Sequence, residues 1–190
     1  MSETKSPSTQ STKVITGLVR FSYLQVFEPS KVGDSEDLKY SVSLIIPKSD
    51  KKTVAAIQKA VAAATEAGKD SKFGGKVPKT LKNPLRDGDE EREDDPAYAN
   101  AWFLTANSKT KPGLVDKDVN PILDREELYS GCYGKASITF YAFDVKGNKG
   151  IACCLNHLQK IKDGENLGGG RGPASDDFEQ EDEDDYSFLD

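Results

Sequence analysis

The spacing of the apolar residues changes once in the first part of the chain, and this change limits the fold. Residues 39–46 alternate between apolar and polar side chains, which is the period of a half-buried strand. Beyond the proline that ends this run, apolar residues recur every three or four positions through residues 50–68, as in a helix. Ser49 or Asp50 can cap that helix, and Gly68 is expected to end it. The fold must therefore place a helix directly after a strand.

Further segments have the composition of strands. Residues 14–27, 99–107, 133–144 and 151–161 are rich in β-branched and aromatic side chains. The last two are joined by Lys146–Lys149, a glycine-containing turn that predicts a hairpin. About five strands and one substantial helix predict a mainly β fold with an inserted helix, and a small barrel of the OB type fits that count.

Composition divides the chain into three parts. Residues 1–12 are polar and Ser/Thr-rich, and they are expected to be a disordered N-terminal segment. Residues 13–162 are long enough for one domain with a real core. Within them, residues 69–97 show no periodicity and are predicted to form a long charged loop. Residues 163–190 are expected to be a flexible linker followed by a disordered acidic tail.

The net charge of −6 hides two parts of opposite sign. Residues 163–190 hold eleven acidic residues and one basic residue, so the rest of the chain carries a net charge of +4. A basic body suits polyanions and an acidic tail suits basic proteins, which favours a nucleic-acid-binding module. The tail could dock on a partner, fold back over the basic face, or only maintain solubility. Its candidate partner-binding residues are Phe178, Tyr186, Phe188 and Leu189.

Alternation along each strand separates expected core positions from expected surface positions. The inward positions are predicted to be Ile15, Val19, Phe21, Tyr23, Trp102, Leu104, Ala106, Ile138, Phe140 and Ala142. The outward positions are predicted to be Thr16, Arg20, Ser22, Lys39, Ser41, Ser43, Phe103, Thr105, Asn107, Lys135, Ser137, Thr139 and Tyr141. In the last strand, Leu158 leaves the face of the other apolar residues, which predicts a bulge.

Exposed rings among basic side chains suit single-stranded nucleic acid. Phosphates meet Lys and Arg, and each base can stack on a ring for ~1–3 kcal/mol whatever the sequence. A helix or a second subunit could instead cover these rings. The basic half of the charged loop adds to the binding hypothesis, because residues 69–86 hold six basic residues and one acidic residue.

Other chemistries have weaker signals. The carboxylates Asp87, Asp89, Glu91 and Asp94 could hold a divalent metal in a nuclease, but their spacing is not that of an EF-hand, and a solvated loop is the alternative. Cys153 and His157 would lie ~13 Å apart on a continuous strand, too far to share zinc.

The remaining signals point to a non-catalytic protein of the cytoplasm. The chain has one His and no phosphate-binding loop of the GxxxxGK[ST] kind, so no catalytic pairing or NTPase is indicated and no cofactor or metal is expected. The three cysteines are expected to be reduced thiols. The chain has neither a secretion signal nor a continuous apolar run of the ~18 residues that a membrane span needs.

Several short motifs together resemble the bacteriophage single-stranded DNA-binding proteins of OB-fold type, the group related to the replication proteins of podophages. The motifs are Asn83–Asp89, Trp102–Leu104, Lys111–Gly113, Tyr129–Tyr133 and Lys149–Ala152. The resemblance implies an OB barrel with a helix between strands, no enzymatic activity and a possible homodimer. It also implies a tail that recruits phage or host replication or recombination proteins. Such tails often close on an aromatic residue, whereas this one closes on Phe188, Leu189 and Asp190.

The sequence therefore predicts a sequence-tolerant single-stranded DNA-binding protein that coats and protects exposed strands, with a tail that regulates access. Nucleic-acid contacts are expected from Arg20, Lys39, Lys79, Lys82, Arg86, Phe103, Lys109, Lys111, Tyr133, Lys135 and Tyr141. Two hypotheses compete with this one: a divalent-metal nuclease, and an interaction adaptor that binds no nucleic acid.

Overall fold

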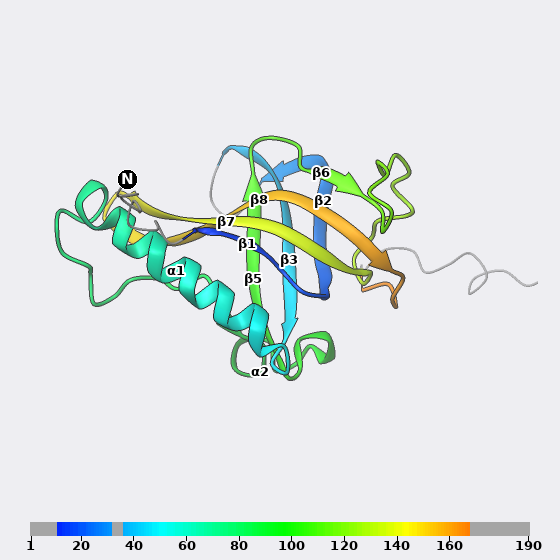
Figure 1. Ribbon diagram of the computed structural model, residues 1–190, viewed down its shortest axis with the longest axis horizontal. Helices are drawn as coiled ribbons and strands as arrows, with labels where there is room; N and C mark the ends of the chain where they lie inside the picture. Colours follow the sequence, from blue (N-terminus) through cyan, green and yellow to red (C-terminus); the bar gives the residue numbers. More distant parts are fainter. Residues whose placement is uncertain (1–10, 32–35, 168–190) are drawn as a thin grey trace, which may run out of the picture.

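The computed structural model describes residues 11–31 and 36–167 (Figure 1). The strands are β1 (Lys13–Ile15), β2 (Val19–Lys31), β3 (Leu38–Pro47), β4 (Arg86–Asp87), β5 (Ala101–Ser108), β6 (Gly113–Val115), β7 (Tyr133–Val145) and β8 (Asn148–Lys162). The helices are α1 (Lys51–Ser71) and α2 (Gly88–Glu91), and η1 (Pro96–Tyr98) is a 3-10 turn. The prediction of a mainly β fold with an inserted helix is confirmed for the described residues.

Five strands close into a barrel. β2 pairs with β3, β3 with β5, β5 with β8, β8 with β7, and β7 returns to β2. Only the β5–β8 contact within this ring is parallel. This closed ring is the five-stranded Greek-key barrel of the OB fold. β1 joins the outside of β7, and β6 joins β8.

Apolar side chains fill the barrel. Phe21, Leu44, Leu104, Ile138 and Phe140 are among the fully buried ones. A second, smaller cluster lies apart from this core and is described below as part of the site. The barrel core fixes the strands and therefore fixes which side chains face outward.

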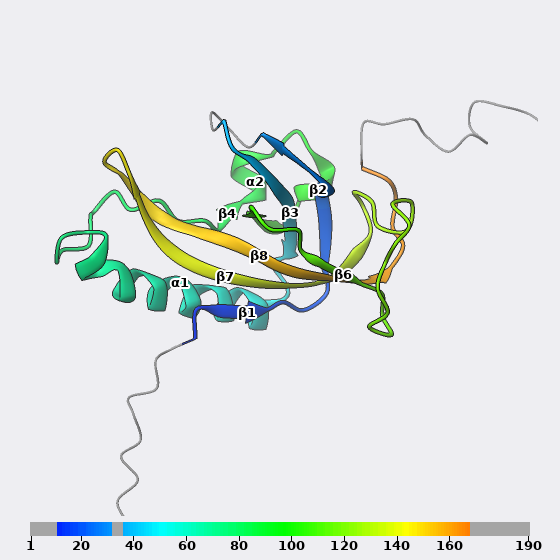
Figure 2. The same ribbon diagram turned by 90° about the horizontal axis from the view of Figure 1, so that it is seen from above.

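Helix α1 lies against β7 and the hairpin that β7 forms with β8 (Figure 2). It begins after Asp50, whose carboxylate accepts from the Thr53 backbone N–H at 3.1 Å. The prediction that Gly68 ends it is wrong, because the helix continues to Ser71 and Gly68 is buried inside it. A Cβ at Gly68 would collide with the Cβ of Ala142 on β7, so glycine allows the close approach. No helix in the described ranges is long and apolar enough to span a membrane.

The β7–β8 hairpin agrees with its prediction. Its turn is Lys146–Gly147, and both residues have positive φ, at 51° and 85°, as a type I′ turn requires. The predicted bulge is also confirmed. Ser137 pairs with His157, but the next residue of β7 pairs with Leu155, so Asn156 is left over. Leu155 and Leu158 can therefore both be buried.

The prediction of one strand over residues 14–27 is wrong, because β1 and β2 are separate. Thr16 lies between them and is buried. Its polar groups are satisfied by Ala136, because its hydroxyl accepts from the Ala136 N–H and its own N–H donates to the Ala136 carbonyl. Ser22 is also buried, contrary to prediction. Ile15 and Tyr23, which were predicted to face the core, are exposed.

The predicted loop at residues 69–97 contains regular structure. It contains the last residues of α1, strand β4, helix α2 and the first two residues of turn η1. The acidic half is thus not a free excursion, and its packing on the barrel shapes the site.

We expect Gly68→Ala to destabilise the protein, although alanine ordinarily favours a helix over glycine. The added methyl group overlaps Ala142, and overpacking of this kind costs about 1–3 kcal/mol. The free energy of unfolding from urea denaturation measures the effect. The double variant Gly68→Ala/Ala142→Gly moves the methyl group to the other partner and should recover much of the loss. A single variant more stable than the parent would contradict this packing.

Candidate nucleic-acid interface

An open groove lies where β5 and β8 separate. The two strands share only the pairs Ala106–Cys153 and Asn107–Cys154. On one side of these pairs, Lys82 forms an isolated bridge with Gly150 of β8 and lines the groove. The groove has a volume of about 810 Å³. Its floor and walls include Lys82, Asn83, Arg86, Trp102, Thr105, Asn107, Phe143 and Ala152.

A second hollow of about 580 Å³ lies on the other side of the same two strand pairs. It is lined by Lys13, Ser108, Thr110, Lys111, Thr139, Cys154, Leu155, Asn156 and His157, with no carboxylate among them. Asn107 lines the groove and Ser108 lines the hollow, so the two openings follow one another along β5. Lysine, hydroxyl and amide groups in this hollow suit a phosphate backbone.

The aromatic side chains of this surface come from β7. Tyr141 is 43% exposed and pairs with Ala152, and Phe143 pairs with Gly150. A Cβ at Gly150 would come within 2.9 Å of the Phe143 ring and of Lys82 Cβ, so glycine lets the ring and the lysine approach the strand. Burial raises the pKa of the Tyr141 hydroxyl, with further contributions from Cys154 and Cys153. The ring therefore stays neutral at physiological pH and can stack on a base.

Residues 86–98, hereafter the strap, cross the outer face of β3 and β5. Tyr98 packs edge-on against Phe103 with ring centroids 5.1 Å apart, and its hydroxyl donates to Ser43 Oγ at 3.1 Å. Phe103 is only 2% exposed, and Ser41 and Ser43 are buried as well. These three residues face away from the barrel core as predicted, but the expected exposure is wrong, and Tyr98 of the strap packs on Phe103 and Ser43. In many OB folds this face is the binding surface.

Ion pairs hold the strap in place. The Lys48 ammonium lies 2.8 Å from an Asp87 oxygen and 2.7 Å from an Asp89 oxygen. Its hydrogen bonds lower the pKa of both carboxyl groups, and they raise the pKa of Lys48. Arg86 holds Glu91 through several hydrogen bonds and lowers its pKa. Asp87, Asp89 and Glu91 are thus paired with protein cations.

These pairs bear on the metal hypothesis. Asp87, Asp89 and Glu91 direct their oxygens at Lys48 and Arg86 and not at a common centre. Within residues 11–31 and 36–167, no group of three or more His, Cys, Asp or Glu side chains is placed to share a metal ion. Three of the four donors proposed for a nuclease, Asp87, Asp89 and Glu91, therefore hold the strap in place.

The structure gathers only part of the predicted nucleic-acid-binding set. Lys82 and Arg86 line the groove, Lys111 lines the hollow, and Tyr141 lies on the β7 strand between them. Lys109 is close by but forms an ion pair with Asp37 at 3.6 Å. Lys79 is exposed in the segment leading to the groove, and Lys39 pairs with Ser30 across the β2–β3 ladder.

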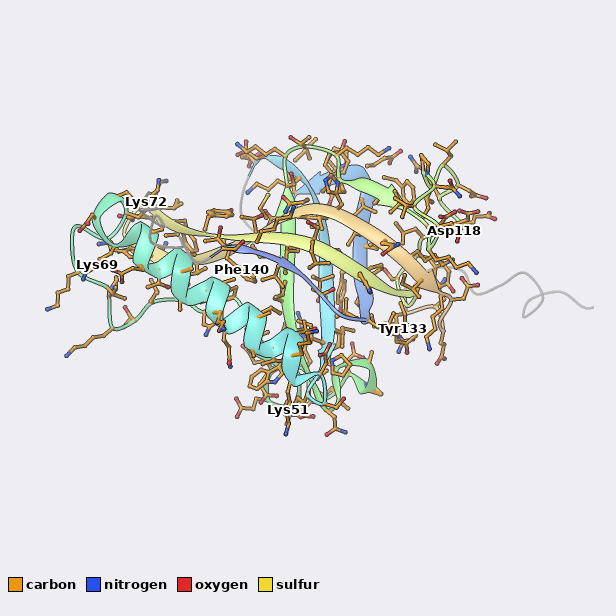
Figure 3. All side chains as sticks on the ribbon, viewed as in Figure 1. Lys51, Lys69, Lys72, Asp118, Tyr133 and Phe140 are labelled. Carbon is orange, nitrogen blue, oxygen red and sulfur yellow. The ribbon has the colours of Figure 1, made fainter. Side chains whose placement is uncertain are left out.

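Three residues of the predicted nucleic-acid-binding set, Arg20, Tyr133 and Lys135, line neither the groove nor the hollow. Arg20 donates to the Gly131 and Glu165 carbonyls and lies over the Tyr133 ring, at the start of β7 (Figure 3). Lys135 borders a separate apolar hollow. The tail residues Phe178, Tyr186, Phe188 and Leu189 lie outside the described part of the chain.

Sequence reasoning missed some residues of this surface. Phe143 continues the outward series of Lys135, Ser137, Thr139 and Tyr141, so the same alternation could have found it. Lys13, Asn156 and His157 carry no local signal, because the strand pairings β1–β7 and β7–β8 bring them to the hollow.

A closed five-stranded barrel with a basic and aromatic groove defines the class as an OB-fold nucleic-acid-binding protein. The sequence matches the family described as Enterobacter phage Enc34, ssDNA-binding protein, over residues 12–188. The chain belongs to this family, which confirms the resemblance. It is also 31% identical over 173 residues to protein p50 of Acyrthosiphon pisum secondary endosymbiont phage 1, covering 88% of this chain and 92% of that protein.

Solved structures agree with this assignment. The single-stranded DNA-binding protein from bacteriophage Enc34, in complex with ssDNA, superposes with a TM-score of 0.70 at 28% identity. The match covers 83% of this chain and 90% of that one. The single-stranded DNA-binding protein gp2.5 of bacteriophage T7 superposes with a TM-score of 0.58, covering 88% of this chain and 95% of that one. At 17% identity, this second likeness concerns the fold alone.

We expect Lys48→Gln to loosen the strap and to destabilise the protein near neutral pH. Carboxyl groups with lowered pKa values contribute stability above the usual Asp pKa, and this contribution is lost as the pH falls through their folded values. Lys48 stays charged throughout, because its pKa is raised. The difference in unfolding free energy between parent and variant should therefore shrink as the pH falls from about 5 to below about 3.

Lys59→Gln is the control for this measurement, since Lys59 is exposed on α1 and its loss removes the same charge. A destabilisation by Lys48→Gln that stays constant with pH would show that the strap does not depend on these ion pairs.

Proposed function

We propose that this protein binds single-stranded DNA with little sequence preference, and that it coats and protects exposed strands during phage DNA replication or recombination. The observation that carries the proposal is the open surface along β5, β8 and β7. Lys82 and Phe143 line its groove, Lys111 and Thr139 line its hollow, and Tyr141 lies on β7 between Phe143 and Thr139. Membership of a phage ssDNA-binding family and the fold of the Enc34 protein solved with ssDNA support it.

The proposed mechanism combines electrostatic attraction of the phosphates with stacking of the bases. The lysines attract the phosphates, and the rings of Tyr141 and Phe143 accept bases on their faces. The hydroxyl and amide groups around them, such as Thr105 and Asn107, can bond to whichever base or sugar atoms arrive. None of these contacts requires a particular base, which accounts for sequence tolerance.

A preference for single strands follows from the same contacts. In a duplex the base faces are already stacked on one another and their edges are paired, so rings on the protein cannot reach them. A single strand can turn its bases toward Tyr141 and Phe143 while its phosphates meet the lysines.

The two openings differ in charge, and this difference suggests a division of roles. The groove includes Asp87, Glu90 and Glu91 beside its cations, whereas the hollow beside Lys111 has only basic and neutral groups. We expect the hollow to hold the phosphate backbone and the groove side to hold bases.

The acidic tail and the protein partners belong to the same proposal. We infer that residues 176–190 compete with DNA for the basic surface at low salt, and that DNA binding releases them to recruit replication or recombination proteins. The protein is proposed to act without catalysis in the cytoplasm of the host, and to form a homodimer.

We expect Tyr141→Ala and Phe143→Ala each to weaken binding to a labelled oligo-dT by ~1–3 kcal/mol. Fluorescence anisotropy at low and moderate salt measures this, with a matched duplex as the competing substrate. Tyr141→Phe keeps the ring and should bind like the parent protein, since stacking does not use the hydroxyl.

Unchanged affinity in both alanine variants would rule out stacking at this surface. Magnesium-dependent cleavage of the oligonucleotide would favour the nuclease, and absence of any nucleic-acid binding at moderate salt would favour the adaptor.

Removal of residues 176–190 should tighten ssDNA binding, and the gain should be largest at low salt, where charge is least screened. The same anisotropy titration, repeated over a salt series on the full chain and the shortened chain, measures it. Equal affinities at every salt concentration would show that the tail does not compete with DNA.

A further inference from the structure

Tyr23 is an exposed aromatic residue in a backbone conformation that tyrosine rarely adopts. Its φ is +46°, in the left-handed region, and its side chain is 60% exposed. It lies at an irregularity of the β2–β3 ladder, between the pairs Ser22–Ser43 and Gln25–Ser41. Strained non-glycine residues persist where the surrounding structure holds them, and they concentrate at functional sites. Burial of the ring does not account for this one, because the ring faces solvent.

Arg92 faces this ring from the strap. Its guanidinium carbon lies 6.0 Å from the centroid of Tyr23, 5.8 Å from Tyr98 and 5.5 Å from Phe103. Tyr98 and Phe103 are buried and pack against each other, so they form a fixed support for the guanidinium, whereas the Tyr23 ring is exposed to solvent.

The charge of Arg92 is available at this place. Among the described residues, no ion pair within 4.0 Å involves Arg92, and Glu91, which precedes it in the chain, is bonded to Arg86. Arg92 still acts on Glu91 through space, as one of the charges that lower the pKa of that carboxyl group. A guanidinium without a carboxylate partner keeps its N–H donors for an incoming phosphate.

Tyr23 and Arg92 are not among the residues that line the groove. Arg86 lines the groove and lies 5.3 Å from the centroid of Phe103, and Arg92 lies 5.5 Å from the same centroid. One buried ring therefore lies beneath two guanidinium groups, one at the groove and one beside Tyr23. The strap is acidic in composition, and Arg86 and Arg92 are its two basic residues. In Figure 2, α2 of the strap and α1 lie on opposite sides of the hairpin, so α1 does not cover the strap.

We propose that Tyr23 and Arg92 form a second subsite for single-stranded DNA, in which the Tyr23 ring stacks on a base and Arg92 binds an adjacent phosphate. The strap buries Phe103 on the usual OB face, and Tyr23 and Arg92 provide an exposed ring and a guanidinium group beside it, whereas Arg86 is bonded to Glu91. The inference rests on the proposed function, because it extends the same DNA path past the groove.

A length series of labelled oligo-dT tests this subsite on the full chain. OB folds occupy about 4–16 nucleotides, so oligonucleotides of about 4 and about 16 nucleotides sample one part of the path and the whole of it. Tyr23→Ala should reduce affinity for the longer strand about 5- to 10-fold, and should leave affinity for the shorter strand nearly unchanged. Tyr23→Phe keeps the ring and should bind both lengths like the parent.

Two further variants separate binding from folding and from net charge. Tyr23→Gly relieves the left-handed backbone, so its melting temperature should equal or exceed that of the parent while its long-strand affinity falls. Arg92→Gln should weaken long-strand binding and lower its salt dependence. Arg125→Gln removes the same charge from a residue that pairs with Glu28, and it should have the smaller effect.

If Tyr23→Ala binds the long strand like the parent while Tyr141→Ala binds it more weakly, the subsite is overturned and the proposed function still stands. Parental affinity of both variants at both lengths would count against the function itself. Equal losses for Arg92→Gln and Arg125→Gln would show that only net charge matters, and this would overturn the role of Arg92.

Discussion

Two residue pairs between β5 and β8 close the barrel, and most of what this protein offers to a ligand depends on how short that contact is. The pairing is parallel and joins segments almost fifty residues apart in the sequence, so the strands meet at Ala106 and Asn107 and then separate on both sides. The groove occupies one separation and the lysine-lined hollow occupies the other. A longer ladder would give a tighter barrel, but it would close these two openings.

The strap shows how a binding surface can move within a common fold. Phe103 stands where an OB barrel would present an aromatic residue to nucleic acid, yet Tyr98 covers it and Ser43 fixes Tyr98. The acidic residues that suggested a metal site hold this cover in place through Lys48 and Arg86. Asp87, Asp89 and Glu91, which the sequence suggested as metal ligands, have a structural role here.

Local rules recovered much of the fold and about half of the site. The hairpin, its turn and the bulge at Asn156 follow from residue types and alternation, because each depends on neighbours in the chain. The strap could not be inferred, since its stability comes from Tyr98 meeting Phe103 and Ser43 across the fold. Tyr23 misled the alternation because its left-handed backbone reverses the side of the strand on which the ring lies. Gly68 read as a helix end because a contact with Ala142 leaves no trace in helical spacing.

The hairpin of β7 and β8 is held on two faces, by α1 through the contact at Gly68 and by the segment that bridges Lys82 to Gly150. A free two-stranded ribbon would sample many shapes and would have to be ordered each time a ligand arrived. Here the β7–β8 hairpin loses its conformational entropy once, during folding. Under the proposed function, the rings of Tyr141 and Phe143 are then already positioned for any base before the ligand binds. Tolerance of sequence in the ligand is then a product of rigidity in the protein.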